Sequence, residues 1–324
     1  MSTIPSVWLL LDERPGHRVQ ALGVAERLGW PCHIKELHYN RLAALANVVL
    51  GRRMWHLTPQ SRAEMKAPWP DLVISSGRRS APVALAIKRR SRGKTKAVHL
   101  MWPDIAPARF DLIAVPQHDM PGHKGANILS TLACAHGFTL SRLQREVKYW
   151  RKTVEHLPHP RIAVLVGGTA RGAEYEDADF TALAAYASAE AERLNGSLMI
   201  ASSPRTGERG EERIQSMLTA PHLFYRWGKG ENPYGGFLAL ADVVIVTGDS
   251  VSMCSEACAT GKPVYIFMPP HLSKSNQEFR QALFAGAHAK PHTYPIRPDW
   301  QPVHLPDAAE EIARAIKTRL FNTA

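Results

Sequence analysis

Residues 241–267 read ADVVIVTGDSVSMCSEACATGKPVYIF. The apolar run 242–248 is followed by a Gly-Asp-Ser turn, by small residues with helical spacing, and by a second apolar run at 263–267. Continuously apolar strands joined through a helix are typical of a parallel sheet that is covered on both faces. The stretch therefore predicts one strand-helix-strand unit of an α/β fold.

The same alternation recurs along most of the chain. Short apolar runs bounded by turn residues lie at 7–11, 71–76, 97–101, 111–115, 162–168, 197–203, 242–248 and 263–267. Stretches with helical periodicity follow several of them, at 19–29, 177–196 and 251–261. The pattern predicts two doubly wound, Rossmann-like domains, with parallel sheets facing across a cleft into which the strand-to-helix loops project.

Chain length agrees with two domains, since 324 residues suit two units of about 150 residues each. The alternation stops once, at a polar helical stretch over 140–157 that ends in Pro-His-Pro. We place the domain boundary there, which gives an N-terminal domain over 1–157 and a C-terminal domain over 158–324. A last helix, roughly Asp307 to Leu320, has no strand after it and is free to pack back on the N-terminal domain.

Positive charge is concentrated in the first half of the chain. The net charge is +11, and residues 1–160 hold 24 Lys and Arg against 11 Asp and Glu, whereas 161–324 hold 16 against 18. The densest cluster is KRRSRGKTK, from Lys88 to Lys96. It contains no aromatic residue for base stacking, so we expect an anionic membrane surface and no nucleic acid as its partner. A solvated helix end is the alternative.

The sequence also gives an expectation for location. The first residues lack a cationic segment with a long apolar run after it, and no apolar run approaches 18 residues. We expect a cytoplasmic protein that lies peripherally on the inner face of the membrane. The four cysteines form no C-x-x-C pair, which predicts free thiols rather than disulfides or zinc ligands.

Two loops of the N-terminal half carry candidate chemistry. After the first apolar run, His17 stands at the start of a helix, where the positive helix end favours the neutral imidazole that accepts a proton. A capping histidine is the alternative. After the run at 71–76, Arg78, Arg79 and Ser80 enter a helix and suit an anionic group, although a solvated basic turn is equally compatible.

A third loop contains His118, Asp119 and His123 after the run at 111–115. Prolines and glycines nearby make this loop irregular, so we expect no metal ion there. We also expect no cofactor elsewhere in the chain. We interpret Asp119 as a carboxylate that orders an acceptor hydroxyl or orients a histidine, and His118 as part of the acceptor site.

Loops of the C-terminal half suit a diphosphate. Gly167, Gly168 and Thr169 follow one apolar run, and the paired glycines let a phosphate or a neighbouring loop approach the backbone. Ser202 and Arg205 follow the next run and suggest a diphosphate clamp.

The opening stretch supplies the last candidates. Ser250 begins a helix whose free amides, at Val251 and Ser252, point toward a ligand. Glu256 lies one turn further on, where a carboxylate can accept two hydrogen bonds from a ribose diol. A glutamate facing solvent is the alternative.

These residues form a recognisable pattern. The stretch 241–267 resembles the donor-binding unit of GT-B glycosyltransferases, including MurG-like enzymes. With D-x-R-P-G-H-x-x-Q at 12–20, ISSGRRSAP at 74–82, PQHD at 116–119 and GGT at 167–169, the chain resembles the family of plant mitochondrial fission (elongated-mitochondria) factors and their bacterial relatives.

The resemblance implies a nucleotide-sugar site. Glu256 would bind the ribose, the start of its helix would lie at the phosphates, and Asn276 and Gln277 would contact the donor sugar. His17 would lie near the acceptor, with His17 or Asp119 as general base and without a metal ion.

The resemblance also implies an activity. We expect transfer of a sugar from a nucleotide-diphosphate sugar to a hydroxyl acceptor, such as a lipid-linked or lipopolysaccharide glycan of the cell envelope, held by the basic N-terminal half. Two alternatives stay open, a nucleotide-sugar epimerase and a non-catalytic adaptor like the plant fission factors.

Overall fold

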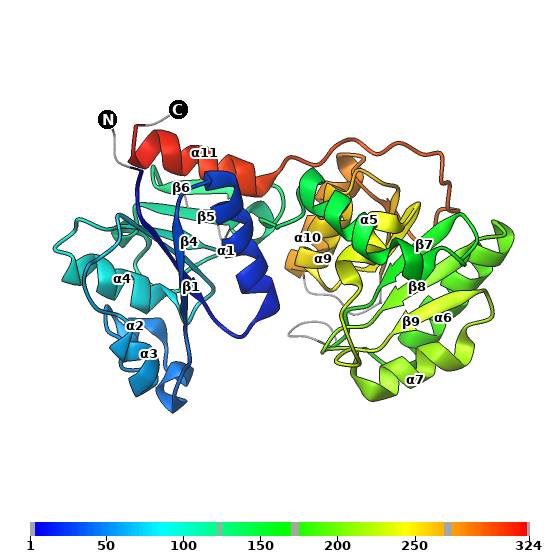
Figure 1. Cartoon of the computed structure of the whole chain (residues 1–324), viewed down its shortest axis with the longest axis horizontal. Coiled ribbons are helices and arrows are strands. Elements are labelled where there is room, and N and C mark those ends of the chain that lie inside the picture. Colours follow the sequence, from blue (N-terminus) through cyan, green and yellow to red (C-terminus); the bar gives the residue numbers. More distant parts are fainter. Residues whose placement is uncertain (1–3, 121, 123–124, 170–174, 269–273, 323–324) are drawn as a thin grey trace. The chain divides into compact units, whose positions relative to one another are not determined.

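The computed structural model describes residues 4–120, 122, 125–169, 175–268 and 274–322 (Figure 1). The chain forms two compact units, one made of residues 1–137 together with 307–324, the other of residues 138–306. Each unit contains a six-stranded sheet in which every pairing is parallel. The predicted α/β fold with two parallel sheets is confirmed.

The first sheet has the strand order β2-β1-β3-β4-β5-β6. Its strands are β1 (Val7–Leu11), β2 (Cys32–Glu36), β3 (Leu72–Ser76), β4 (Lys96–Leu100), β5 (Leu112–Pro116) and β6 (Ile128–Thr131). The unit's helices are α1 (Pro15–Leu28), α2 (Asn47–Leu50), α3 (Pro59–Ala63), α4 (Ala81–Arg90) and α11 (Ala308–Leu320), with short 3₁₀ turns at Arg41–Ala44, Pro107–Arg109 and Gln117–Asp119.

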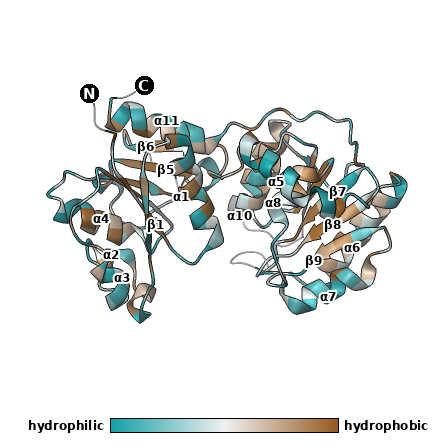
Figure 2. Cartoon of the chain, in the orientation of Figure 1, coloured by the Kyte–Doolittle hydropathy of each residue, from teal (hydrophilic) through white to brown (hydrophobic). Residues whose placement is uncertain are grey.

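Alternate side chains of the first sheet enter two different cores, which explains its continuously apolar strands. Leu9 and Leu11 of β1 pack with α1 and α11 on one face. Trp8 and Leu10 pack with α4 on the other. Figure 2 shows the resulting pattern, with largely brown strands and helices along which brown and teal alternate. Both faces are covered, as a parallel sheet requires.

The second sheet has the strand order β12-β11-β10-β7-β8-β9. Its strands are β7 (Arg161–Leu165), β8 (Ser197–Ala201), β9 (His222–Tyr225), β10 (Val243–Thr247), β11 (Val264–Phe267) and β12 (Lys290–Pro291). The helices of this unit are α5 (Leu140–Val154), α6 (Asp177–Arg193), α7 (Gly207–Met217), α8 (Tyr234–Leu240), α9 (Val251–Ala259) and α10 (Lys274–Ala285). Phe180 and Leu183 of α6 and Ile214 of α7 pack against one face of the sheet.

The boundary between the units lies before helix α5, not after it as the sequence predicted. Helix α5 packs against α8 of the second unit, and two glycines of α8 make this contact close. A Cβ atom on Gly236 would lie 2.3 Å from the Trp150 ring, and one on Gly235 would lie 2.6 Å from the Glu146 carboxyl. The polar sequence of α5 therefore conceals a packed face and does not mark a linker.

The end of the chain belongs to the first unit. Ile312 and Ile316 of α11 lie in the core that α1 shares with the sheet. Asp307 caps α11 and pairs with Arg27 of α1, with 2.7 Å between Nη2 and Oδ2. In the part of the chain that the structure describes, no helix is long and apolar enough to cross a membrane.

Strand order locates the places where ligands are expected. In each sheet the chain first builds outward in one direction and then returns to the other side of its first strand, which creates a switch between β1 and β3 and another between β7 and β10. In open α/β sheets ligands bind at the carboxyl ends of the strands at such switches. The loops after these four strands are therefore the first to consider.

Candidate functional site

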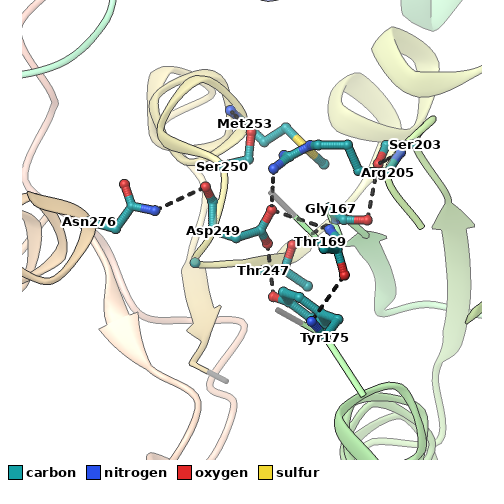
Figure 3. A network of polar contacts seen from close by, with 12 residues as sticks. Gly167, Thr169, Tyr175, Ser203, Arg205, Thr247, Asp249, Ser250, Met253 and Asn276 are labelled. Atoms are coloured by element: carbon teal, nitrogen blue, oxygen red, sulfur yellow. Dashed lines mark hydrogen bonds and ion pairs between the residues drawn. The ribbon is translucent and has the colours of Figure 1, made fainter. Parts of the chain in front are cut away.

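The carboxyl ends of β7 and β10 meet at a buried aspartate. The Asp249 side chain has no exposed surface and its Oδ2 lies 2.8 Å from Nη1 of Arg205. Oδ2 also accepts a hydrogen bond from the Gly168 amide at 3.2 Å, and Oδ1 accepts one from the Tyr175 hydroxyl at 2.8 Å. Figure 3 shows the side chains of Arg205 and Tyr175 meeting this carboxylate from two different loops. Asp249, which follows β10, thus connects its own loop with the loops after β7 and β8.

The two glycines after β7 leave room for protein atoms. A Cβ atom on Gly167 would lie 2.2 Å from Oδ2 of Asp249. Gly168 has a φ of +146°, and a Cβ atom there would lie 2.2 Å from the backbone oxygen of Arg205. The sequence allowed either a phosphate or a neighbouring loop at these glycines, and the structure places the neighbouring loop there.

The loop after β8 is tied to the same glycines. Ser203 and Thr206 donate to the carbonyl oxygen of Gly167 at 3.0 and 2.6 Å. Ser202 is buried and donates to Oε1 of Glu211 at 2.5 Å. Arg205 and Ser202 are the two residues of the predicted diphosphate clamp. The Arg205 side chain is partly exposed, at 32%, whereas the Ser202 hydroxyl is used within its own loop and α7.

Helix α9 begins beside this network. Ser250 is its N-cap, and its hydroxyl accepts the Met253 amide at 3.4 Å. Asn276 of α10 donates to the backbone oxygen of Asp249 at 3.2 Å, which joins α10 to the network (Figure 3). Val251 and Ser252, the first residues of α9, are partly exposed. The structure thus brings Ser250, the start of α9 and Asn276 together with Arg205.

A cavity of about 490 Å³ lies next to the network, between the starts of α6 and α7. Thr169, Tyr175 and Thr206 line it, together with Arg209. Thr169 is held in place because its hydroxyl accepts the Tyr175 amide at 3.1 Å. The volume is large enough for a small-molecule ligand.

Glu256 lies in a second, separate cluster of this unit. Its side chain points from α9 toward α8, where the Tyr234 hydroxyl donates to Oε2, and the residue is only 6% exposed. Burial raises the pKa of Glu256 to about 7, although the Tyr234 hydrogen bond and the charge of Arg142 lower it. Glu256 is therefore no solvent-facing glutamate. Gln277, on α10, is exposed.

Replacing Asp249 tests whether it joins the loops. Asp249→Ala removes the acceptor for Gly168 and Tyr175 and the partner of Arg205, so we expect the free energy of unfolding to fall by about 2 to 3 kcal/mol, less than for a fully buried ion pair because Arg205 is partly exposed. Asp299→Ala removes an exposed partner of Arg297 and should cost under about 1 kcal/mol. Urea denaturation measures both, and equal losses would contradict this role of Asp249.

The first unit has its own cluster at the switch between β1 and β3. The imidazole of His17 lies with Nδ1 3.1 Å from both carboxyl oxygens of Asp12. Burial alone raises the pKa of Asp12, but the hydrogen bond and charge of His17 outweigh it and hold that pKa below its usual value. Gly77 has a φ of +78°, and a Cβ atom there would lie 2.2 Å from Cε1 of His17. Asp12 and Gly77 fix the ring.

The three residues predicted to bind an anion at this switch, Arg78, Arg79 and Ser80, all have partners within the protein. Arg78 donates to the carbonyl oxygens of Leu45 and Ala43 at 2.7 and 2.8 Å. Arg79 forms an ion pair with Glu13, with 2.9 Å between Nη1 and Oε1. Ser80 is buried, and its hydroxyl donates a hydrogen bond to the carbonyl oxygen of Ser76. Of these three residues, only Arg79 contacts an exposed side chain, since the side chain of its partner Glu13 is 60% exposed.

The loop after β5 holds the last predicted residues. The His118 side chain is 3% exposed, and its Nε2 lies 3.7 Å from Oδ2 of Asp119, whose side chain is 36% exposed. His123 lies outside the described residues. Across the described ranges, no three His, Cys, Asp or Glu side chains are arranged to hold a metal ion.

Sequence reasoning missed the two aspartates that organise these clusters. Asp12 lies in D-x-R-P-G-H, from which His17 was selected, and Asp249 lies in T-G-D-S, from which Ser250 was selected. Each directly follows an apolar run, and a carboxylate at the end of a buried strand was the available signal. Tyr175 and Tyr234 gave no signal, because their partners come from other elements.

Solved structures with a similar fold include UDP-N-acetylglucosamine 2-epimerases and a forosaminyltransferase. A putative UDP-N-acetylglucosamine 2-epimerase from Listeria monocytogenes has a TM-score of 0.63 and 13% identity, over 99% of this chain and 98% of that chain. The UDP-GlcNAc 2-epimerase of Methanocaldococcus jannaschii, in complex with UDP-GlcNAc and UDP, has a TM-score of 0.55 and 12% identity over 96% and 99%. The spinosyn forosaminyltransferase SpnP has a TM-score of 0.52 and 13% identity over 99% and 91%. The GT-B-like fold is confirmed.

Curated relatives resemble the chain more closely in sequence. An uncharacterized protein of Rickettsia prowazekii is 29% identical over 301 residues, which cover 83% of this chain and 84% of the relative. The mitochondrial fission protein ELM1 of Arabidopsis thaliana is 28% identical over 236 residues, 66% of this chain and 55% of the plant protein. The family model described as mitochondrial fission ELM1 matches residues 15–320. With nearly its whole length matched, the chain belongs to the ELM1 mitochondrial fission family.

Proposed function

We propose that the second unit binds a nucleotide-diphosphate sugar and that the chain transfers the sugar to a hydroxyl acceptor. The observation that carries this proposal is the partly exposed side chain of Arg205, whose guanidinium is held by buried Asp249 beside the start of α9 (Figure 3), at the switch of the second sheet. Arginine and free helix amides are the groups that proteins use for phosphates. The similarity to nucleotide-sugar enzymes supports the same site through the fold.

In this proposal the diphosphate lies against Arg205 and the first amides of α9, at Val251 and Ser252. The negative charge that develops on the leaving diphosphate is then stabilised by these groups, so the reaction needs no resident metal ion. Asn276 extends from α10 toward the donor sugar, with Gln277 beside it in the sequence. The cavity beside Thr169 provides further space for the donor.

Glu256 binds the ribose in this proposal. Its Oε2 already accepts a hydrogen bond from the Tyr234 hydroxyl, which supports an acceptor role toward a ribose hydroxyl. A ribose diol would use the second carboxylate oxygen or displace Tyr234. Because the pKa of Glu256 is about 7, the carboxylate becomes a full acceptor only above neutral pH.

The chemical step is a displacement at the anomeric carbon. The acceptor oxygen forms a bond to that carbon, the bond to the diphosphate breaks with its electron pair, and the nucleoside diphosphate leaves. His17 takes the acceptor proton on Nε2, since Nδ1 is held by Asp12. We propose an acceptor carried on an anionic membrane, such as a lipid-linked glycan, because positive charge gathers in the first half of the chain.

Isothermal titration with a panel of nucleoside diphosphates and their sugars tests the donor site. We expect micromolar binding of one of them and a loss of at least tenfold, about 1.4 kcal/mol, in Glu256→Ala. Glu212→Ala changes an exposed glutamate of α7 and should bind like the wild type. Binding should strengthen from pH 6 to pH 8 more in the wild type than in Glu256→Gln, because only the wild type gains a carboxylate.

The titration also separates the competing functions. If no nucleotide binds, both the transferase and the epimerase proposals fail, and an adaptor role is left. If one binds, incubation of its sugar without any acceptor distinguishes the two reactions, since an epimerase converts the sugar alone and a transferase does not. The epimerase is the second candidate because an epimerase structure shares the fold at a TM-score of 0.63.

A further inference from the structure

A pocket of the first unit is lined mainly by basic residues. It has a volume of about 430 Å³ and lies where α4 ends and where the chain enters β5. Its basic lining residues, the basic pocket from here on, are Arg52, Lys88, Arg89, Arg92 and Arg109.

Most of this charge is not neutralised by the protein. Lys88 pairs with Asp111, with 2.7 Å between Nζ and Oδ2. The four arginines are exposed, and within the described ranges their guanidinium groups make no hydrogen bond or ion pair. Arginines elsewhere in this unit do have partners, such as Arg18 with Glu36 at 2.6 Å and Arg27 with Asp307. The four guanidinium groups are therefore available to a ligand.

The end of helix α4 does not use these arginines either. The helix ends in a tight turn in which the amides of Arg92 and Gly93 donate to the carbonyls of Arg89 and Lys88. The carbonyl oxygens of Lys88 and Arg89 are thus satisfied by the backbone and not by an arginine side chain. Attraction between the helix dipole and a nearby cation is worth about 0.3–1 kcal/mol and fades within one turn, so it accounts for one arginine at most and not for four.

Exposed apolar side chains gather in the segment that supplies Arg52. Of the fourteen large apolar side chains exposed within the described ranges, five lie between residues 42 and 55, and we call these five the apolar segment. They are Leu42, Leu45, Val48, Val49 and Trp55. Val48 is 78% and Val49 60% exposed, on consecutive positions of α2. Arg53 lies over the Trp55 ring at 4.3 Å.

We propose that the basic pocket and the apolar segment together dock the first unit on an anionic lipid surface. The arginines bind lipid phosphates, and Val48, Val49 and Trp55 enter the interface between headgroups and acyl chains. Charge together with Trp55 also suits nucleic acid, but the other four side chains of the apolar segment are aliphatic and do not stack on bases. An acidic protein is an outcome of the test below.

This inference rests on the membrane-borne acceptor proposed above, but not on sugar transfer. Its test therefore uses vesicles and the full chain without any nucleotide. Failure to bind a nucleotide leaves the vesicle result intact, and failure to bind vesicles leaves the donor site intact.

Cosedimentation with vesicles measures the docking. We expect the chain to bind vesicles that contain phosphatidylglycerol and to bind pure phosphatidylcholine at least tenfold more weakly, with the difference shrinking as salt rises. Arg52→Gln/Arg89→Gln/Arg92→Gln should weaken binding to the anionic vesicles at least tenfold. The matched control, Arg145→Gln/Lys148→Gln/Lys152→Gln, removes the same charge from exposed positions of α5 and should bind nearly as the wild type.

A second variant tests the apolar segment. Val48→Ser/Val49→Ser keeps the charge and alters only exposed side chains, so it should fold normally by circular dichroism while losing about tenfold in vesicle binding. Equal losses in the two triple variants would overturn the proposal, as would equal binding to neutral and anionic vesicles. Binding of soluble pyrophosphate or of an acidic polypeptide to the basic pocket, without vesicle binding, would assign it to that ligand instead.

Discussion

Replacing His17 with alanine is expected to lower the rate of sugar transfer at least a hundredfold and to leave the affinity for the donor unchanged. A positioned general base contributes about 10²- to 10⁴-fold to such reactions. His17 is well placed for the role because Asp12 holds Nδ1 at 3.1 Å, which leaves Nε2 to accept the proton. His33→Ala changes an exposed histidine of β2 and should leave the rate unaltered.

The measurement is release of nucleoside diphosphate from the donor that titration identifies, with a membrane lipid extract as the source of acceptor. Asp12→Asn keeps the shape of the contact but removes the charge that stabilises the imidazolium formed in the step, so the rate of sugar transfer should fall. If His17→Ala turns over like the wild type and Asp119→Asn does not, the base is Asp119 and our assignment is wrong.

Replacing Gly168 with alanine is expected to destabilise the second unit by about 4 kcal/mol or to prevent its folding. Two effects add up, because φ is +146° and the new Cβ atom would lie 2.2 Å from the Arg205 backbone oxygen. A backbone atom cannot turn away as a flexible side chain does, so the loops themselves would have to separate.

Gly207→Ala is the matched control for this substitution. Gly207 also has a positive φ, +68°, but nothing lies within 4 Å of its Cβ position. Alanine there should lower the free energy of unfolding by only about 1 kcal/mol, through the strain of a positive φ. Urea denaturation of both variants separates steric exclusion from backbone strain, and similar losses would show that the Arg205 loop yields easily.

The sequence predicted the inner strands of both sheets and missed the outer ones. Every apolar run quoted above overlaps an inner strand, and the four strands without such a run, β2, β6, β9 and β12, are the edges of the two sheets. Inner strands are apolar throughout because both faces are buried. The edge strands are partly exposed along most of their length, so they offer no continuous apolar run.

The candidate site was predictable only in part, for a related reason. A sequence shows which residues follow each strand, so Gly167, Arg205 and Ser250 could be named as candidates. It does not show that β7 lies beside β10, and Asp249 contacts the loop after β7 only through that pairing. Glu256 was predicted as a ligand, but its burial against Tyr234 depends on how α8 and α9 pack, which no local pattern encodes.

The place of helix α11 has a consequence for how the protein is made. Ile312 and Ile316 cover an apolar face of a sheet whose strands are all synthesised before residue 132. The second unit, residues 138–306, lies between them in the chain and can complete its core first. The unit that leaves the ribosome first is therefore the last to be finished, and until the final helix emerges its uncovered face is a surface for chaperones or for aggregation.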